Sequence, residues 1–203
     1  MAAQAPSKGR YHHGDLRRAV LDGALVTIEA DGPAALSLRD VARRAGVSHA
    51  APAHHFGDKA GVLTAIAAEG YTLLAVALRD ALVDSGDDLM QGGIAYIRFA
   101  LEHRAHFEVM FRPELYRPDD QAVTEARQEA AEILFGAVRG ILGEASEEEV
   151  WGGVIAVWSF THGFATLTLN SNLDPEHDDD AETAVRVAGA AVMRLAAAGA
   201  FRQ

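Results

Sequence analysis

The chain has 203 residues, of which 49% are hydrophobic and 23% charged, and its formal net charge is −11. These proportions are typical of a globular protein with one large domain, or with a small domain joined to a larger one. The sequence contains no cysteine, which excludes disulfides, thiolate metal sites and a cysteine nucleophile. The opening residues MAAQAPSKGR lack the apolar core of a signal peptide, so we expect a cytoplasmic protein.

The charge is distributed unevenly along the chain. Residues 1–60 have a net charge of +2, whereas residues 61–203 have a net charge of −13. Five of the nine histidines also lie in the first segment and would add positive charge when protonated. This asymmetry favours an N-terminal segment that approaches a polyanion and a C-terminal body that does not.

The first two predicted helices lie near the N-terminus. Apolar residues recur at helical spacing from Asp15 to Ala30, and turn-forming residues follow directly. Ser37 is expected to be the N-cap of a second helix, which Gly46 ends by adopting a left-handed conformation.

A third helix is expected from His49 to about Phe56, with Ser48 as its N-cap. Asp58 is then expected to cap a long fourth helix that runs to about Val83. Two short helices joined by a glycine-containing turn and braced by a preceding helix form a helix-turn-helix. The second of those helices can enter the major groove of DNA.

Beyond Asp84 every periodic stretch is helical, and no strand-like alternation appears. The expected helices span residues 87–103, 105–112, 119–142, 147–171 and 179–198. The predicted fold is therefore all-α. A three-helix helix-turn-helix domain with an N-terminal arm occupies residues 1–60, and a helical bundle for ligand sensing and dimerisation occupies residues 61–203.

Residues 150–169 contain no charged side chain and are about long enough to span a bilayer. Glycines and hydroxyl side chains dilute the hydrophobicity, however, and the flanking residues are acidic rather than basic. A helix buried on all sides at the centre of a dimer has the same composition. We prefer this interpretation to that of a peripheral membrane protein and expect no membrane association.

Residues 11–71 resemble the DNA-binding domain of the TetR family of bacterial regulators. The residues that carry the resemblance are the core LSLRDVARRAGVS, followed by HHF and by GDK at the start of the next helix. The C-terminal part resembles the subgroup with a Trp-His-Gly signature, through Trp158, His162 and Gly163. The resemblance implies an all-α homodimer whose last two helices pair with their symmetry mates. It also implies a transcription regulator that binds a palindromic operator, usually as a repressor released by a small molecule.

The resemblance also implies which residues contact DNA. Residues at phosphate-contact positions are Ser37, Arg39, His55 and Lys59, together with an arm that includes Lys8, Arg10, Tyr11, His12 and His13. Residues at base-contact positions are Ser48, His49, Ala50 and His54. Lys59 has an independent reason to bind phosphate, because it lies in the first turn of a helix whose free N–H groups favour an anion. For His55, packing beside Phe56 is an equally good interpretation.

One position departs from the family pattern. The family usually has a tyrosine where this chain has Ala53, and that tyrosine supports a phosphate contact. Its loss leaves open an alternative function, a helical ligand-binding protein with weakened DNA binding.

Aromatic side chains and methionine are concentrated in the C-terminal part, and we expect most of them in the core and some of them in the lining of a cavity between helices. Candidate ligand-binding residues are Tyr96, Phe99, Phe107, Met110, Phe111, Trp158 and His162. Pockets between helices are mostly apolar with a few polar groups, so the unknown effector is expected to be apolar or aromatic. The alternative role for His162 is a hydrogen bond that ties two helices together.

Two other classes of protein compete with a ligand-responsive regulator. None of the common motifs of nucleophilic hydrolases, phosphate loops, dinucleotide sites or zinc proteases is present, so we expect no catalytic residues, no cofactor and no enzyme. A metal-sensing regulator is an alternative, because Glu102, His103 and His106 could share a helix face at ligand spacing. No second cluster completes such a site, so we expect no metal and interpret the two histidines as solvent-facing.

Overall fold

The computed structural model describes residues 13–86, 88–170 and 181–197, and these ranges contain helices and turns but no strand. The elements in chain order are α1 (His13–Asp31), the 3₁₀ turn η1 (Pro33–Ala35), α2 (Leu38–Arg44), α3 (Ala51–Phe56), α4 (Lys59–Ser85), α5 (Leu89–Glu102), α6 (Arg104–Met110), the 3₁₀ turn η2 (Pro113–Leu115), α7 (Gln121–Leu142), α8 (Glu147–Leu169) and α9 (Ala181–Ala197). The all-α prediction is confirmed.

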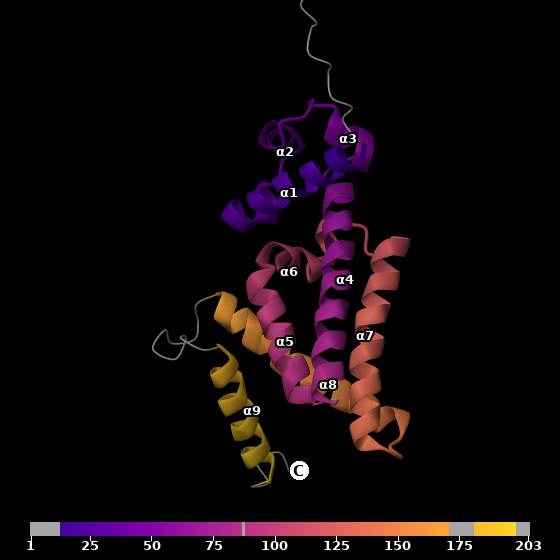
Figure 1. The fold of residues 1–203 in the computed structure, drawn as a ribbon, viewed down its shortest axis with the longest axis vertical. Helices are drawn as coiled ribbons and strands as arrows, with labels where there is room; N and C mark the ends of the chain where they lie inside the picture. Colours follow the sequence, from indigo (N-terminus) through magenta and orange to yellow (C-terminus); the bar gives the residue numbers. More distant parts are fainter. Residues whose placement is uncertain (1–12, 87, 171–180, 198–203) are drawn as a thin grey trace, which may run out of the picture.

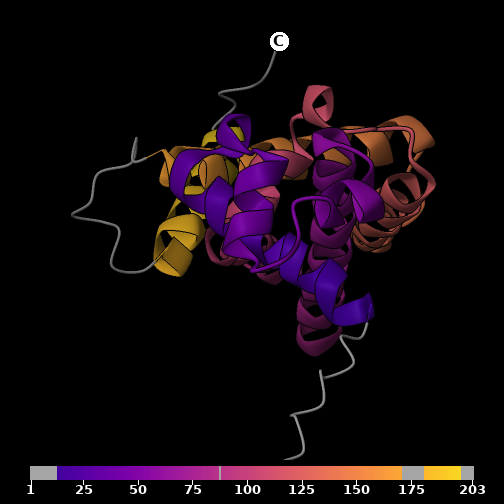
Figure 2. The same ribbon diagram turned by 90° about the horizontal axis from the view of Figure 1, so that it is seen from above.

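Helices α1–α3 form a small head at one end of α4, and helices α4–α9 form the body (Figure 1). Helix α4 runs from the head along the length of the body, with α7 beside it and α5 and α6 on its other side. Helices α7 and α9 lie on opposite sides of the body in both Figure 1 and Figure 2. The head and the body share one continuous hydrophobic core, which extends from Val20 in α1 to Val185 in α9.

Helix α4 is apolar around most of its circumference, and its buried residues extend from Gly61 to Leu82. Asp58 caps it by accepting a hydrogen bond from the backbone N–H of Gly61 at 2.8 Å, as predicted. Gly86 ends it with a left-handed φ of 68°. A helix buried on so many sides fixes the position of each element that packs on it.

The caps of the two short helices differ from the prediction. Ser37 occupies the N-cap of α2, but its side chain makes no capping hydrogen bond. Helix α3 begins at Ala51 with Ala50 as its N-cap, so the prediction that Ser48 caps it is wrong. The reason is local: the N–H of Ala51 donates to the backbone oxygen of Ser48 at 3.0 Å, which forms a turn before the helix begins. Gly46 has the predicted left-handed conformation, with φ of 65°.

Helix α8 is exposed over much of its surface. It begins with a capping box between Ser146 and Glu149. Trp151 and Trp158 are 55% and 42% exposed, so these two tryptophans are not part of the core in which we expect most of the aromatic residues. Helices α4 and α8 are both long and apolar enough to cross a membrane by composition. Helix α4 is a mostly buried core helix, whereas α8 has an unpartnered apolar face.

The start of α4 gives a test of this packing. A Cβ atom at Gly61 would lie 1.8 Å from the backbone oxygen of Phe56, so Gly61→Ala forces the end of α3 to move. We expect a loss of unfolding free energy of about 2 kcal/mol or more, measured by urea denaturation. The control is Gly136→Ala in α7, where a Cβ meets nothing within 4 Å. Because alanine favours helix more than glycine does, this control should be stabilised by about 0.5–1 kcal/mol. Equal stability of the two variants would contradict the described packing.

Candidate nucleic-acid interface and ligand pocket

The outer surface of the head contains most of the predicted DNA contacts. Exposed side chains there are Arg39, Arg43 and Arg44 of α2 and Ser48, His49, Ala50 and His54 in or just before α3. Ser37, His55 and Lys59 are half-buried at the edges of this surface. Arg10 and the rest of the predicted arm lie outside the residues whose side chains the structure describes. The structure therefore brings the predicted base-contact residues together on one exposed surface.

Lys59 has a contact within the head. Its Nζ donates to the backbone oxygen of Ala34 at 2.7 Å, which joins η1 to the first turn of α4. An ammonium group has three donors, so two remain for other partners. The ring of Phe56 packs beneath the guanidinium of Arg17, 5.2 Å from its centroid, and the ring of His55 lies 6.4 Å from that of Phe56. The side chain of His55 therefore packs against Phe56 and remains partly exposed to solvent.

An ion pair joins the end of α3 to the body. Arg117, between η2 and α7, donates from Nη2 to both carboxylate oxygens of Asp58, at 2.9 and 2.8 Å. The hydrogen bond from the Gly61 N–H, with the charge of Arg117, lowers the pKa of Asp58. The backbone N–H of Arg117 also donates to Oγ1 of Thr64 at 3.1 Å. Asp58 thus caps α4 and holds the η2–α7 segment at once.

A second connection links α1 to α4 and α6. Arg18 donates from Nη1 to both carboxylate oxygens of Glu69 at 2.8 Å, and Nε2 of His106 lies 3.3 Å from Oε1 of the same carboxylate. Gly70 permits this close packing, because a Cβ there would lie 2.5 Å from Sδ of Met110. Glu69 therefore bridges the head and the body.

The prediction that His106 faces solvent is wrong, because α6 packs it beneath α4 and leaves it 6% exposed. Burial lowers the pKa of His106, although the neighbouring Glu69 carboxylate acts in the opposite direction. Helix α5 ends at Glu102 and α6 begins at Arg104, so Glu102 and His106 do not share one helix face. Within the described residues, no group of three or more histidine and acidic side chains is arranged to hold a metal ion.

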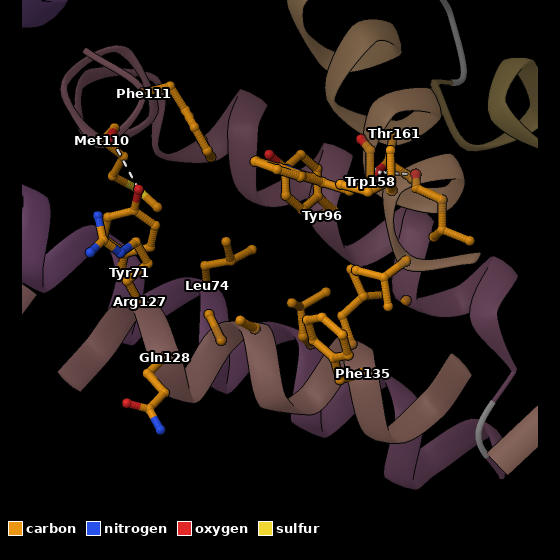
Figure 3. A pocket seen from close by; sticks show the side chains of 18 of the residues that line it. Tyr71, Leu74, Tyr96, Met110, Phe111, Arg127, Gln128, Phe135, Trp158 and Thr161 are labelled. Atoms are coloured by element: carbon orange, nitrogen blue, oxygen red, sulfur yellow. Dashed lines mark hydrogen bonds between the residues drawn. The ribbon is translucent and has the colours of Figure 1, made fainter. Parts of the chain in front are cut away.

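A pocket of about 640 Å³ lies between α4, α5, α7 and α8 (Figure 3). Four of the predicted ligand residues line it, namely Tyr96, Met110, Phe111 and Trp158. The other lining residues include Tyr71, Leu74, Leu78 and Leu82 of α4, Tyr116, Arg127, Gln128, Leu134 and Phe135 near or in α7, and Trp151, Val154 and Thr161 of α8. The contributions of α4 and α7 were not predicted from the sequence, because a helix that packs in the core and a helix that lines a cavity have the same spacing of apolar residues.

Three predicted ligand residues lie behind the pocket wall rather than in it. Phe99 and Phe107 are buried in the core. Nδ1 of His162 lies 2.8 Å from the hydroxyl of Tyr96, and the imidazole stacks on Phe107 with centroids 5.3 Å apart. Burial lowers the pKa of His162 and raises that of Tyr96. His162 therefore ties α8 to α5 and supports the lining residue Tyr96.

Family models match both parts of the chain. A model described as bacterial regulatory proteins, tetR family, matches residues 20–66. A model described as tetracyclin repressor-like, C-terminal domain, matches residues 89–199, more than half of the chain. No curated protein matches the chain significantly.

Several solved structures are similar over nearly the whole chain. One is a protein of unknown function from Rhodococcus sp. RHA1, with 31% identity, a TM-score of 0.74, and coverage of 92% of this chain and 98% of that one. Another is the TetR family transcriptional regulator PfmR from Thermus thermophilus, with 24% identity, a TM-score of 0.66, and coverage of 86% and 97%. A third is a bacterial regulatory protein in the tetR family from Rhodococcus RHA1, with 19% identity, a TM-score of 0.67, and coverage of 89% and 96%.

Burial of His106 predicts a pH dependence of stability. The unfolded chain protonates this histidine below about pH 6.5, whereas the folded chain, with its lowered pKa, stays neutral to lower pH. The unfolded state then binds more protons, so the free energy of unfolding decreases as the pH falls below about 6.5. His106→Asn should show a shallower decrease than wild type when urea denaturation is repeated from about pH 8 to about pH 5. Equal slopes for the two proteins would show that His106 is not buried in its neutral form.

Proposed function

This chain belongs to the TetR family of bacterial transcription regulators, and from this premise we propose that it is a cytoplasmic, non-enzymatic repressor that binds a palindromic operator and is released by an apolar or aromatic ligand. The observation that carries the DNA-binding part is the exposed surface around α3. Ser48, His49, Ala50 and His54 lie there together, and none of the four side chains is buried in the core. Their exposure supports a role in contacts outside the chain.

Base recognition is assigned to those four residues of the α3 surface. Imidazoles can donate to or accept from base edges, and an alanine methyl can contact the methyl group of thymine. Phosphate contacts are assigned to Arg10, Ser37, Arg39, His55 and Lys59. The hydroxyl of Ser37 is free of a capping bond, and Lys59 keeps two donors after binding Ala34, which supports both assignments.

Dimerisation is assigned to α8 and α9. The apolar face of α8 is exposed in a single chain, and a Cβ at Gly152 or Gly163 would meet nothing within 4 Å. The fold of one chain therefore does not require glycine at these positions, whereas a second helix packed closely against them would. Two α8–α9 pairs would form a four-helix interface and place two copies of α3 on one face of the dimer. Gly163, with Trp158 and His162, also supports membership of the Trp-His-Gly subgroup.

We assign release by a ligand to a series of contacts that connects the pocket to the head. Met110 lines the pocket, and its backbone oxygen accepts hydrogen bonds from Tyr71 at 3.1 Å and Tyr116 at 2.9 Å. Tyr116 directly precedes Arg117, which holds Asp58 at the end of α3. A ligand that displaces Tyr116 would therefore move the partner of Asp58. On this basis the functional boundary lies near residue 60, with DNA binding before it and ligand binding and dimerisation after it.

Selection from a random DNA pool tests the DNA-binding part. We expect an enriched inverted repeat, because a two-fold symmetric dimer binds two half-sites. Arg39→Gln should weaken binding to all sequences. It should also reduce the slope of log affinity against log salt concentration by about the amount expected for one phosphate contact. His54→Ala should instead relax the preference at one base position in each half-site.

Fluorescence anisotropy with the selected operator and a scrambled duplex separates these outcomes. Thr72→Ala, on the exposed side of α4, is the control and should leave both affinities unchanged. If no sequence is enriched, or if the selected and scrambled duplexes bind equally weakly, the chain is not a sequence-specific regulator.

A further inference from the structure

The pocket differs from the rest of the molecule in its charge. The chain has 18 lysines and arginines and 29 aspartates and glutamates, yet Arg127 is the one charged side chain among the described residues that line the pocket. No acidic side chain and no histidine is among them. In a protein with a net charge of −11, a lining without a single carboxylate is a local reversal of charge.

Most other polar groups of the lining already have partners inside the protein. The hydroxyls of Tyr71 and Tyr116 both donate to the backbone oxygen of Met110. Oγ1 of Thr161 donates to a backbone oxygen of its own helix, and Nε2 of Gln128 donates to Glu132 at 2.8 Å. These groups therefore have little remaining capacity to orient a ligand through a strong hydrogen bond.

Arg127 is different. It projects from α7 beside Tyr71 and Met110 (Figure 3), and its charge partly offsets the rise in the pKa of Tyr71 that burial causes. It is exposed, so it lies where water reaches the pocket. A guanidinium has five N–H donors, and no described residue forms an ion pair or hydrogen bond with that of Arg127. Arg139, on the same helix, is by contrast paired with both oxygens of Glu147 at 3.0 and 2.9 Å.

The opposite part of the pocket is aromatic. In Figure 3, Phe135, Tyr96 and Trp158 lie on the other side of Leu74 from Arg127. Tyr96 is held by His162 and is buried, so this end offers rings rather than free donors. The pocket thus has an unpaired cation at one end and an apolar interior at the other.

We propose that the pocket binds an amphipathic monocarboxylate, whose carboxylate pairs with Arg127 and whose elongated apolar tail lies along Leu74 towards Phe135 and Trp158. This inference rests on the proposed function, because it names the ligand class of the same effector pocket. A carboxylate matches the planar fork of a guanidinium with two parallel hydrogen bonds. A cationic head group would be repelled by Arg127, and a neutral one would leave its charge unpaired.

Intrinsic fluorescence can test this proposal directly. The chain has two tryptophans, Trp151 and Trp158, and both line the pocket. The full chain is titrated with dodecanoate, dodecanol and dodecylamine, below the micellar concentrations of the two ionic probes and the solubility limit of dodecanol. The same tail is thus tested with an anionic, a neutral and a cationic head. We expect dodecanoate to bind about tenfold or more tightly than either of the others, as a charge-assisted hydrogen bond implies.

Variants of Arg127 identify the source of the preference. Arg127→Gln should weaken dodecanoate binding about tenfold or more and leave dodecanol binding within about twofold. Arg127→Lys should keep part of the preference, because it keeps the charge but loses the fork. Arg139→Gln is the matched control: it removes the same charge from the same helix about 18 Å away and should keep the full preference.

Three results would overturn the proposal: equal affinity for the acid and the alcohol, an unchanged preference in Arg127→Gln, or no fluorescence response to any of the three probes. Operator affinity, measured on the same preparations with each probe present, distinguishes this failure from failure of the proposed function. If dodecanol releases operator DNA as well as dodecanoate does, the pocket is still an effector site and only the assignment of an anionic ligand fails.

Discussion

The burial of α4 determines where every functional residue lies. This helix has 27 residues, begins three residues after α3 ends, and packs against α1, α5, α6 and α7. Its apolar side chains fill both the core beneath the head and the wall of the pocket. Because protein cores are close-packed, a ligand that shifted α4 would also displace the elements packed against this helix. The head is therefore oriented by the same element that a ligand would contact.

The polar connections between head and body have a different role from the core. Asp58–Arg117 and Arg18–Glu69 are largely solvent-exposed pairs, and exposed ion pairs contribute little to stability. In both pairs the arginine contacts both oxygens of one carboxylate, a geometry that is more specific than a single hydrogen bond. Stability comes from the apolar core, and these pairs add specific contacts between the head and the body.

Much of the fold could be predicted from the sequence, since helical periodicity and the turn and capping residues Gly46 and Asp58 act locally. The failures have two physical causes, one a local backbone turn and the other a tertiary contact. Ser48 lost its role as a cap to a turn of its own backbone, and His106 is buried because Gly70 lets α6 approach α4. The aromatic residues of the pocket were found in part because they cluster in sequence. Arg127 carried no local signal, because nothing in its neighbours indicates that it faces a cavity whose walls come from several helices.

The most direct test of the central claim, that α3 enters the major groove of a two-fold symmetric operator, uses the absence of cysteine from the chain. A single cysteine placed by Ala53→Cys on the exposed side of α3 can carry an iron chelate that cleaves nearby DNA, and Glu144→Cys, in the exposed turn between α7 and α8, gives the control. We expect the label at position 53 to cut the selected operator at two positions related by the dyad of the inverted repeat, and the label at position 144 to leave it intact. Uncut DNA from the label at position 53, with the operator still bound, would contradict that claim.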